Sequence, residues 1–439
     1  MSEQGRSLPV VGQGHGQRSR GRSPFGAAAP SITLALVYAL LLGVWLAVGD
    51  RLPGGRWFAV HLFTLGVLTN LILTFSEHFA RTVTRTAGER AAWWPIVTNL
   101  GIALTLLGLP TGWLPVLAAG ATIVTGSVFA AYWRLRRMRH EAVGARFAWI
   151  VRIYERAHGA FIHGAVFGAL LGVGVVTGVW YLPVRLAHLH ANILGWGGLT
   201  LLATLVFFGP TMARCQIEPG ADQRAARALR HGATGLAVAV FVLLLTGLDD
   251  PWAAVAQLGA GAGLAVFAVA AVVVCLPVFR AVYGARVTAA RPLVLGVCVW
   301  LPVVVWADVV VVATGAWAWL DALGIVALSG VLAQAITATL VYLAPMLRGR
   351  TTEARDVIRQ RLEVGARTRA GVLNLGVLLA ALGGARLVDG PPLLGTGWVL
   401  VGVTLAATLV VGLWPYRAGV TTPAAAPADG SGSSGEGGE

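Results

Sequence analysis

The sequence predicts an all-α fold, a bundle of about twelve transmembrane helices in a polytopic membrane protein. Of its 439 residues, 56% are hydrophobic and only 12% are charged, whereas soluble domains carry about 25% charged residues. Runs of about 20 apolar residues, the length that crosses the hydrocarbon layer, recur along the chain. The basic residues are all arginine, and they gather in every second connection between these runs. These three observations together indicate a protein that crosses the bilayer repeatedly.

Short turns separate the apolar runs in alternation with longer, arginine-rich connections. Leu109-Pro-Thr-Gly112 and Asp249-Asp-Pro251 are examples of the short turns, because proline and glycine interrupt regular helix. The predicted spans, in order, are 31–49, 57–80, 92–109, 113–133, 157–181, 187–209, 232–249, 252–278, 292–315, 322–346, 370–388 and 392–414.

The arginines set the orientation, because cytoplasmic loops hold the positive charge of membrane proteins. With the N-terminus inside, the inner segments hold 29 of the 33 basic residues, and the outer segments hold only Arg51, Arg56, Arg185 and Arg386. We therefore expect a multi-pass protein of the plasma membrane with both termini cytoplasmic. This distribution also explains the net charge of +14. We therefore expect the lipid bilayer, and no nucleic acid, as the partner of the chain.

The two ends of the chain differ from the apolar region between them. Residues 1–29 are rich in Gly, Ser and Arg, and 417–439 are rich in Pro, Ala, Gly and Ser. Such compositions bury too little apolar surface to fold. We expect a disordered basic cytoplasmic N-terminal segment (1–29), a twelve-helix transmembrane domain (30–416) and a disordered C-terminal tail (417–439).

Two of the predicted spans begin with related histidine motifs. His61-Leu-Phe-Thr-Leu-Gly66 and His190-Ala-Asn-Ile-Leu-Gly195 carry His, Leu and Gly at the same offsets. Both spans run from outside to inside, so their imidazoles can meet at one level of the bilayer.

A third histidine, His188, lies two residues before His190. Two residues correspond to about 200° around an ideal helix, so the two side chains face different ways. They serve one site only if the helix start is irregular, and otherwise belong to two sites or networks.

A second group of histidines falls at the inner ends of the spans. It consists of His78, His158 and His163, with Glu77 and Glu155 beside them. Glu155-Arg-Ala-His158 has the Glu-x-x-His spacing of carboxylate-bridged metal bundles, but a single copy disfavours a two-metal centre. Pairing of Glu155 with Arg152 or Arg156 is the simpler interpretation.

Ionisable side chains within a membrane are functional hypotheses by default, and imidazole binds haem iron and copper. We therefore predict metal sites at His61, His188 and His190 on the outer side, and at His78, His158 and His163 on the inner side. Asn192 is a candidate to hydrogen-bond a ligand or a haem propionate at a cofactor-binding site formed with the outer histidines. Asp308, within span 292–315, is either a proton or cation site or an interhelical hydrogen bond. No catalytic residue is assigned.

The elements His61-x-x-x-Leu-Gly66 and His188-x-His190-x-Asn192-x-Leu-Gly-Trp196 resemble the histidine-bearing helices of NnrS-type haem and copper membrane proteins. They are also similar to the wider haem–copper oxidase subunit I-like group, including actinobacterial proteins associated with copper oxidases. The resemblance implies a membrane protein that binds haem, of b type, with copper as a further metal. It implies a role in respiratory or nitrogen-oxide redox metabolism and electron transport, with a redox protein as partner.

The chain also departs from the oxidase pattern. Oxidase subunits carry histidines on helices 7 and 10, whereas here the seventh predicted span has none and the tenth has Gln334. A binuclear oxygen-reducing centre is therefore not expected. Two other functions remain open, a proton-coupled secondary transporter that uses Asp308, and a non-catalytic assembly or anchoring subunit of a redox complex.

Overall fold

The computed structural model describes residues 28–48, 54–86, 93–142, 147–349, 351–385 and 391–413. Within these ranges the chain is helical and has no strand, which confirms the all-α prediction. The expected N-terminal segment, apart from its last two residues, and the expected C-terminal tail lie outside the described residues.

Most of the chain forms long helical rods. Their elements are α1 (Ala29–Val48), α2 (Gly55–His61), η2 (Leu62–Leu68), α3 (Thr69–Thr84), α4 (Trp94–Gly108), α5 (Leu114–Glu141), α6 (Ala148–Gly172), η3 (Gly178–Trp180), α7 (Tyr181–His190), η4 (Ala191–Gly198), α8 (Leu199–Ala213), α9 (Ala221–Leu243), η5 (Leu244–Gly247), α10 (Trp252–Tyr283), α11 (Arg291–Thr314), η6 (Trp317–Trp319), α12 (Leu320–Ile325), η7 (Val326–Ala333), α13 (Gln334–Arg348), α14 (Thr352–Glu363), α15 (Ala366–Gly384) and α16 (Pro391–Leu413).

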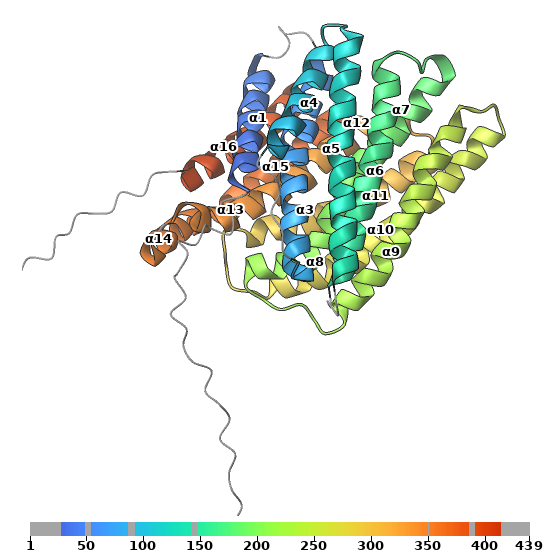
Figure 1. The fold of residues 1–439 in the computed structure, drawn as a ribbon. Helices are drawn as coiled ribbons and strands as arrows, with labels where there is room; N and C mark the ends of the chain where they lie inside the picture. Colours follow the sequence, from blue (N-terminus) through green and yellow to red (C-terminus); the bar gives the residue numbers. More distant parts are fainter. Residues whose placement is uncertain are drawn as a thin grey trace, which may run out of the picture.

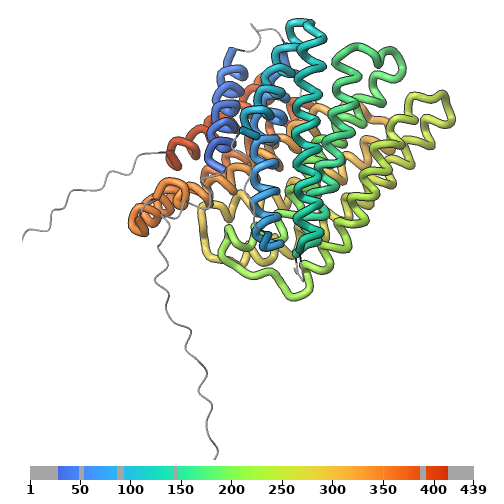
Figure 2. Tube along the Cα trace, in the orientation of Figure 1, coloured from blue at the N-terminus to red at the C-terminus, as the bar shows by residue number. Residues whose placement is uncertain are grey.

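The rods stand side by side, with α1 and α16 on one flank of the bundle and α9 and α10 on the opposite flank (Figure 1). Between them α3, α5 and α6 pack against one another, as the trace also shows (Figure 2). We keep the words outer and inner for the two ends of the bundle. The outer end carries the start of α2 and of α7, and the inner end carries the end of α3 and of α8.

Nine helical rods in the described ranges are long and apolar enough to span a bilayer, so the protein is a multi-pass membrane protein. Each of the twelve predicted runs overlaps a helix, but the runs on α4, α6 and α15 fall short of this standard. Helix α4 has only 15 residues. The other two begin with charged side chains, which include Arg152 on α6 and Arg367 on α15. The count of twelve is therefore not confirmed by length and composition.

One helix, α14, lies in a connection for which the sequence predicted no structure. Its first turn is capped by Thr351, whose Oγ1 accepts a hydrogen bond from the amide of Ala354 at 3.1 Å. Ala354, Ile358 and Leu362 recur every four residues and are all buried, so they form a narrow apolar stripe. The arginines on the other faces made this segment resemble a loop in the sequence.

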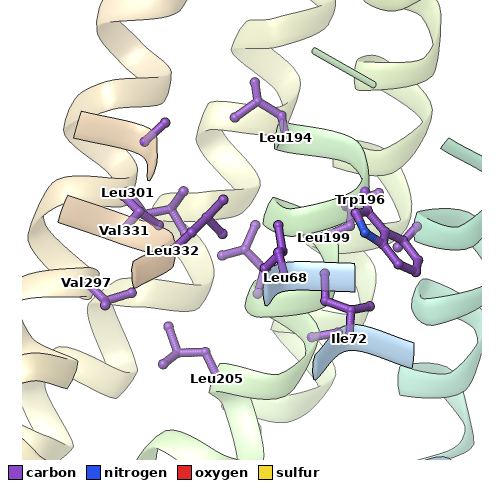
Figure 3. Close-up of a cluster of buried hydrophobic side chains, with 14 of the residues drawn as sticks. Leu68, Ile72, Leu194, Trp196, Leu199, Leu205, Val297, Leu301, Val331 and Leu332 are labelled. Carbon is purple, nitrogen blue, oxygen red and sulfur yellow. The ribbon is translucent and has the colours of Figure 1, made fainter. Parts of the chain in front are cut away.

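Three of the rods contain a π-helical segment near their middle, η2, η4 and η7. Single-turn π-bulges occur in α-helices, frequently at functional sites, but here the wide turn lasts for seven or eight residues. The three segments meet inside the bundle. A Cβ atom on Gly197 of η4 would lie 3.1 Å from Leu332 of η7 and 3.6 Å from Leu68 of η2. Figure 3 shows this meeting point, where the absence of a side chain lets the rods approach.

Helices α9 and α10 approach through a reciprocal pair of glycines. A Cβ atom on Gly263 would lie 2.5 Å from the carbonyl oxygen of Gly235, and a Cβ atom on Gly235 would lie 2.6 Å from the carbonyl oxygen of Gly263. Small residues of this kind let membrane helices pack backbone to backbone.

We expect Gly263→Ala to destabilise the protein by about 1–3 kcal/mol, the usual effect of overpacking, because the obstacle is backbone that cannot rotate away. Thermal unfolding in detergent measures the change. On the same helix, Gly259 has only an ordinary contact, Val242 Cγ1 at 3.4 Å, so Gly259→Ala serves as the control. Equal melting temperatures for the two variants would show that α9 and α10 are packed less closely at Gly263 than these distances indicate.

Candidate metal-binding site

A cavity of about 2150 Å³ lies among the three π-helical rods, α1, α6 and α16. This volume exceeds the about 300–1,000 Å³ of ordinary ligand pockets. Most of its lining side chains are apolar. The ionisable and amide side chains on its wall include His61, His188, His190, Asn192 and Asp308, so all the residues of the predicted outer site, with Asp308, line one space.

His61 and His188 form a pair of facing imidazoles. Their ring centres are 6.2 Å apart and their planes differ by only 19°. His61 also stacks on Trp57, one turn earlier, with ring centres 4.1 Å apart. The two rings come from α2 and α7, the first parts of two different rods. The repeated motif matched His61 with His190, whereas the ring that faces His61 is that of His188.

The backbone holds both rings in one orientation. His61 Nδ1 lies 2.8 Å from the carbonyl oxygen of Trp57, and His188 Nδ1 lies 2.7 Å from that of Gly164. A carbonyl only accepts hydrogen bonds, so each Nδ1 must carry the proton. Each Nε2 is then left with a lone pair, the state in which histidine binds a metal.

Glycines on α6 make room for this arrangement. A Cβ atom on Gly168 would lie 2.6 Å from His188 Cε1 and 2.7 Å from its Nδ1. Asn192 lies one turn after His188 and packs against Gly164, where its amide nitrogen donates to the carbonyl oxygen of His188 at 2.8 Å. Asn192 therefore supports the helix that carries His188, in the role of a neighbour rather than of a ligand.

His190 faces a different partner, as its two-residue separation from His188 predicted. Its Nε2 lies 3.0 Å from Asp308 Oδ2 on α11, and its Nδ1 lies 2.7 Å from the carbonyl oxygen of Leu186. Both side chains are buried, with exposed fractions of 5% for His190 and 10% for Asp308. The contact confirms the interhelical hydrogen bond that was one interpretation of Asp308.

The hydrogen bonds of His190 fix the charge of this pair. Nδ1 must donate to the Leu186 carbonyl, so Nε2 and the Asp308 carboxyl share one further proton. The pair is either imidazolium with carboxylate or imidazole with carboxylic acid, and its net charge is zero in both forms. A neutral pair is the form that a low-dielectric interior tolerates.

The structure does not gather the predicted inner group into one site. His163 is exposed on α6 with its ring edge against Phe241, whereas His158 is fully buried with Nδ1 2.7 Å from the Tyr154 carbonyl oxygen. His78 is half-buried beside Phe79 on α3. In the described ranges no three His, Cys, Asp or Glu side chains are grouped as metal ligands.

The two inner glutamates pair with arginines. Glu77 contacts Arg81 at 2.6 Å and Arg134 at 3.5 Å. Glu155 contacts Arg139 on α5, with its two oxygens at 2.5 and 3.2 Å, rather than the expected Arg152 or Arg156. The end of α5 packs against the start of α6, so the nearest guanidinium comes from another helix, which sequence spacing does not reveal.

The third π-helical rod repeats the motif without a histidine, a feature that the sequence analysis missed. Ile325-Val-Ala-Leu-Ser-Gly330 has glycine five residues after its first position, as do the motifs that begin at His61 and His190. Ile325 occupies the position of the histidines and lines the same cavity. The shared offset of the glycine was the sequence signal that could have revealed this third copy of the motif. The third rod supplies no imidazole at the level of the histidines.

No protein-family model matches the sequence, and a search of curated proteins gives no significant match.

Proposed function

We propose that this chain is an integral membrane haem-binding protein with a redox function, in which His61 and His188 would hold the iron. The facing pair of imidazoles in one cavity carries the proposal. The resemblance of the same two segments to NnrS-type and haem–copper oxidase-like helices supports a role in respiratory or nitrogen-oxide metabolism, with a redox protein as electron partner. We further propose twelve crossings of the plasma membrane with both termini cytoplasmic, because the arginine distribution favours that topology.

The spacing of the imidazoles suits one metal between them. Two metal–nitrogen bonds of about 2.0–2.1 Å, with about 1 Å from each nitrogen to its ring centre, require centres about 6 Å apart. The rings would turn from their stacked arrangement to direct both Nε2 lone pairs, which lie in the ring planes, at the metal. The centres lie 6.2 Å apart, and each Nδ1 is bonded to a carbonyl. Histidine ligands commonly bond their second nitrogen in this way, which sets the tautomer.

The cavity provides for the rest of a haem. Its apolar walls suit a porphyrin, and its volume of about 2150 Å³ exceeds that of ordinary ligand pockets. Arg185 lines the cavity one turn before His188, and its guanidinium would pair with the carboxylates of the group. Trp57, stacked on His61, would fix the first ligand.

A haem held by the imidazoles of His61 and His188 would supply one-electron transfer. The residues of this chain then hold both imidazoles, exclude water with apolar walls and keep the neutral His190–Asp308 pair beside the site. Electron transfer is the function that this arrangement supports best.

Copper is the second candidate, because two neutral imidazoles are also suitable ligands for this metal. The same Nε2 atoms would hold it, and no further residue is needed. Metal content distinguishes the two candidates, since only haem brings iron and a porphyrin spectrum.

The deciding experiment is an absorbance spectrum with metal analysis of the full chain purified in mild detergent from haem-supplied cells. We expect a Soret band and about one iron per chain from the single imidazole pair. Copper without a Soret band would favour the second candidate. A colourless protein free of both metals would refute both.

We expect Gly168→Ala to lower the haem content of the purified protein markedly. The new methyl group would meet the His188 ring, which must then turn away from the Gly164 carbonyl and from His61. Changes at groups that orient a metal ligand typically weaken binding about 10- to 100-fold. Haem per chain is measured by pyridine haemochrome absorbance.

The control is Gly159→Ala on the same helix, where a Cβ atom would have no neighbour within 4 Å. The control should keep the haem content of the wild-type chain. Full haem content in Gly168→Ala would mean that the position of the His188 ring does not matter for binding.

A further inference from the structure

A line of polar groups runs along the contact between α6 and the rod formed by α7, η4 and α8. The two pack antiparallel, because Gly168 lies against His188, His158 against Trp196 and Tyr154 against Thr204. On the rod, polar or amphipathic side chains recur every fourth residue, His188, Asn192, Trp196, Thr200 and Thr204. Sixteen residues at about 1.5 Å each make this line about 24 Å long, against a hydrocarbon thickness of about 30 Å.

Helix α6 adds polar groups to the same line. His158 meets the Trp196 ring edge to face, with centres 4.6 Å apart, and the Tyr154 hydroxyl lies 2.8 Å from Thr204 Oγ1. Glu155, beside Tyr154, forms the ion pair with Arg139 at the inner end. The line therefore runs from the buried Tyr154 hydroxyl, beside the ion pair of Glu155 at the inner end, to the wall of the cavity. It meets that wall at Trp196, Asn192 and His188, which all line the cavity.

The hydroxyl groups at the inner end have a defined direction. Thr204 Oγ1 donates to the carbonyl oxygen of Thr200 at 2.7 Å. Its proton is used in that bond, so the Tyr154 hydroxyl must be the donor to Thr204. Hydroxyl groups in such a series accept one proton and donate another.

Two atoms in the middle of the line have no hydrogen-bond partner among the described residues, Trp196 Nε1 and Thr200 Oγ1. Trp196 is only 1% exposed and Thr200 only 8%. Buried polar atoms are nearly always bonded, to ordered water where protein offers nothing. Polar groups are also costly inside a membrane, so plain packing does not explain a line of them.

We propose that the seam between α6 and α8 holds a file of water molecules that conducts protons from the inner face to the cavity. A proton enters from inner bulk water past the ion pair of Glu155 and Arg139, because Tyr154 itself is fully buried. Each hydroxyl or water in turn accepts one proton and releases another, so one proton reaches the cavity and every group in the file is left with its donor and acceptor sides exchanged. Rotation of each hydroxyl and water then restores the starting orientation before the next proton passes. The waters between Tyr154 and Asn192 bind the two partnerless atoms.

The first test detects the water itself and does not depend on haem. Hydroxyl radicals generated by X-rays from bound water label adjacent side chains, so full-length protein in lipid nanodiscs should show labelled Trp196 despite its burial. Thr200→Val keeps the shape but removes the hydroxyl that binds the water, and should lower Trp196 labelling about tenfold, the factor that corresponds to about 1.4 kcal/mol.

The matched control is Thr122→Val on α5, where an exposed hydroxyl is bonded to its own helix, and it should leave Trp196 labelling unchanged. Unlabelled Trp196 in the wild-type chain, or equal labelling in Thr200→Val, would overturn the proposal. If the seam held no water, Thr200→Val would remove a buried hydroxyl that has no hydrogen-bond partner. The variant would then be more stable than the wild-type protein.

The second test measures the proton and rests on the proposed haem. Adding one electron to a buried haem favours uptake of one proton, because an uncompensated charge is costly there. In oriented vesicles reduced by dithionite, pH dyes should show uptake from the arginine-rich side, slowed about tenfold by Thr200→Val. Uptake from the opposite side, or at an unchanged rate, would contradict conduction through the seam. A missing Soret band would instead contradict the haem, and the labelling result would still decide the water file.

Discussion

Alanine at either His61 or His188 is expected to remove nearly all of the haem from the purified protein. Each substitution deletes one of the two facing imidazoles, and no other described histidine contacts the vacated position. Loss of a group that merely orients a ligand weakens metal binding about 10- to 100-fold, so loss of a ligand itself should exceed that range. The Soret absorbance per chain, compared with the wild-type protein, measures the effect.

His163→Ala is the control for this pair of variants, because His163 is exposed on α6 and contacts Phe241 rather than the cavity. It should retain the full Soret band. His190→Ala should also retain a band, since its ring is bonded to Asp308. Haem that survives in the His61→Ala and His188→Ala double variant would show that the ligands lie elsewhere.

Hydropathy predicted the all-helical membrane architecture because it follows directly from the solvent, whereas the orientation that the arginines favour stays a prediction. A bilayer requires long apolar helices, and a cytoplasmic surface favours arginine, so these signals are local in the sequence. The spans predicted at α4, α6 and α15 are helical, but these helices are short or begin with charges. The count of twelve crossings is therefore not confirmed by length and composition.

The sequence predicted the depth in the bilayer at which the imidazoles of the candidate site lie, but not which imidazoles face each other. The shared offsets of the two histidine motifs placed His61 and His190 at one depth, and helix geometry separated His190 from His188. Which of the two faces His61 depends on contacts between distant segments. Asp308, 118 residues after His190, forms a hydrogen bond with the His190 ring. Gly168 leaves space for the His188 ring. Neither contact has a signature in the spacing of the histidines.

The π-helical segments explain why one motif recurs three times. Each wide turn includes a glycine, Gly66, Gly195 or Gly330, and these segments bring the three rods together at the centre of the bundle (Figure 3). Two rods carry histidine just before the wide turn, and the third carries Ile325. The repeat therefore belongs to the packing of the bundle, and the imidazoles are an addition to two of its three copies.

Asp308→Ala is expected to destabilise the protein by about 1–3 kcal/mol, the usual effect of leaving a buried polar atom without its hydrogen-bond partner. In the variant His190 loses the proton that it shared with Asp308, and its Nε2 lone pair stays buried without a partner at that position. The midpoint of unfolding in a denaturing detergent titration measures the loss. Asp308→Asn should be milder, because the amide still offers a hydrogen bond.

The matched control is Asp356→Ala on α14, where the carboxylate pairs with Arg359 at 2.8 Å on the exposed surface. Exposed pairs contribute only about 0–1 kcal/mol, so this variant should unfold close to the wild-type midpoint. The double variant His190→Leu with Asp308→Leu removes both charges and should recover most of the loss, since apolar replacements of buried pairs are often neutral. If the double variant is instead as unstable as the two single variants added together, the two side chains act independently and the neutral pair is not what stabilises this end of the cavity.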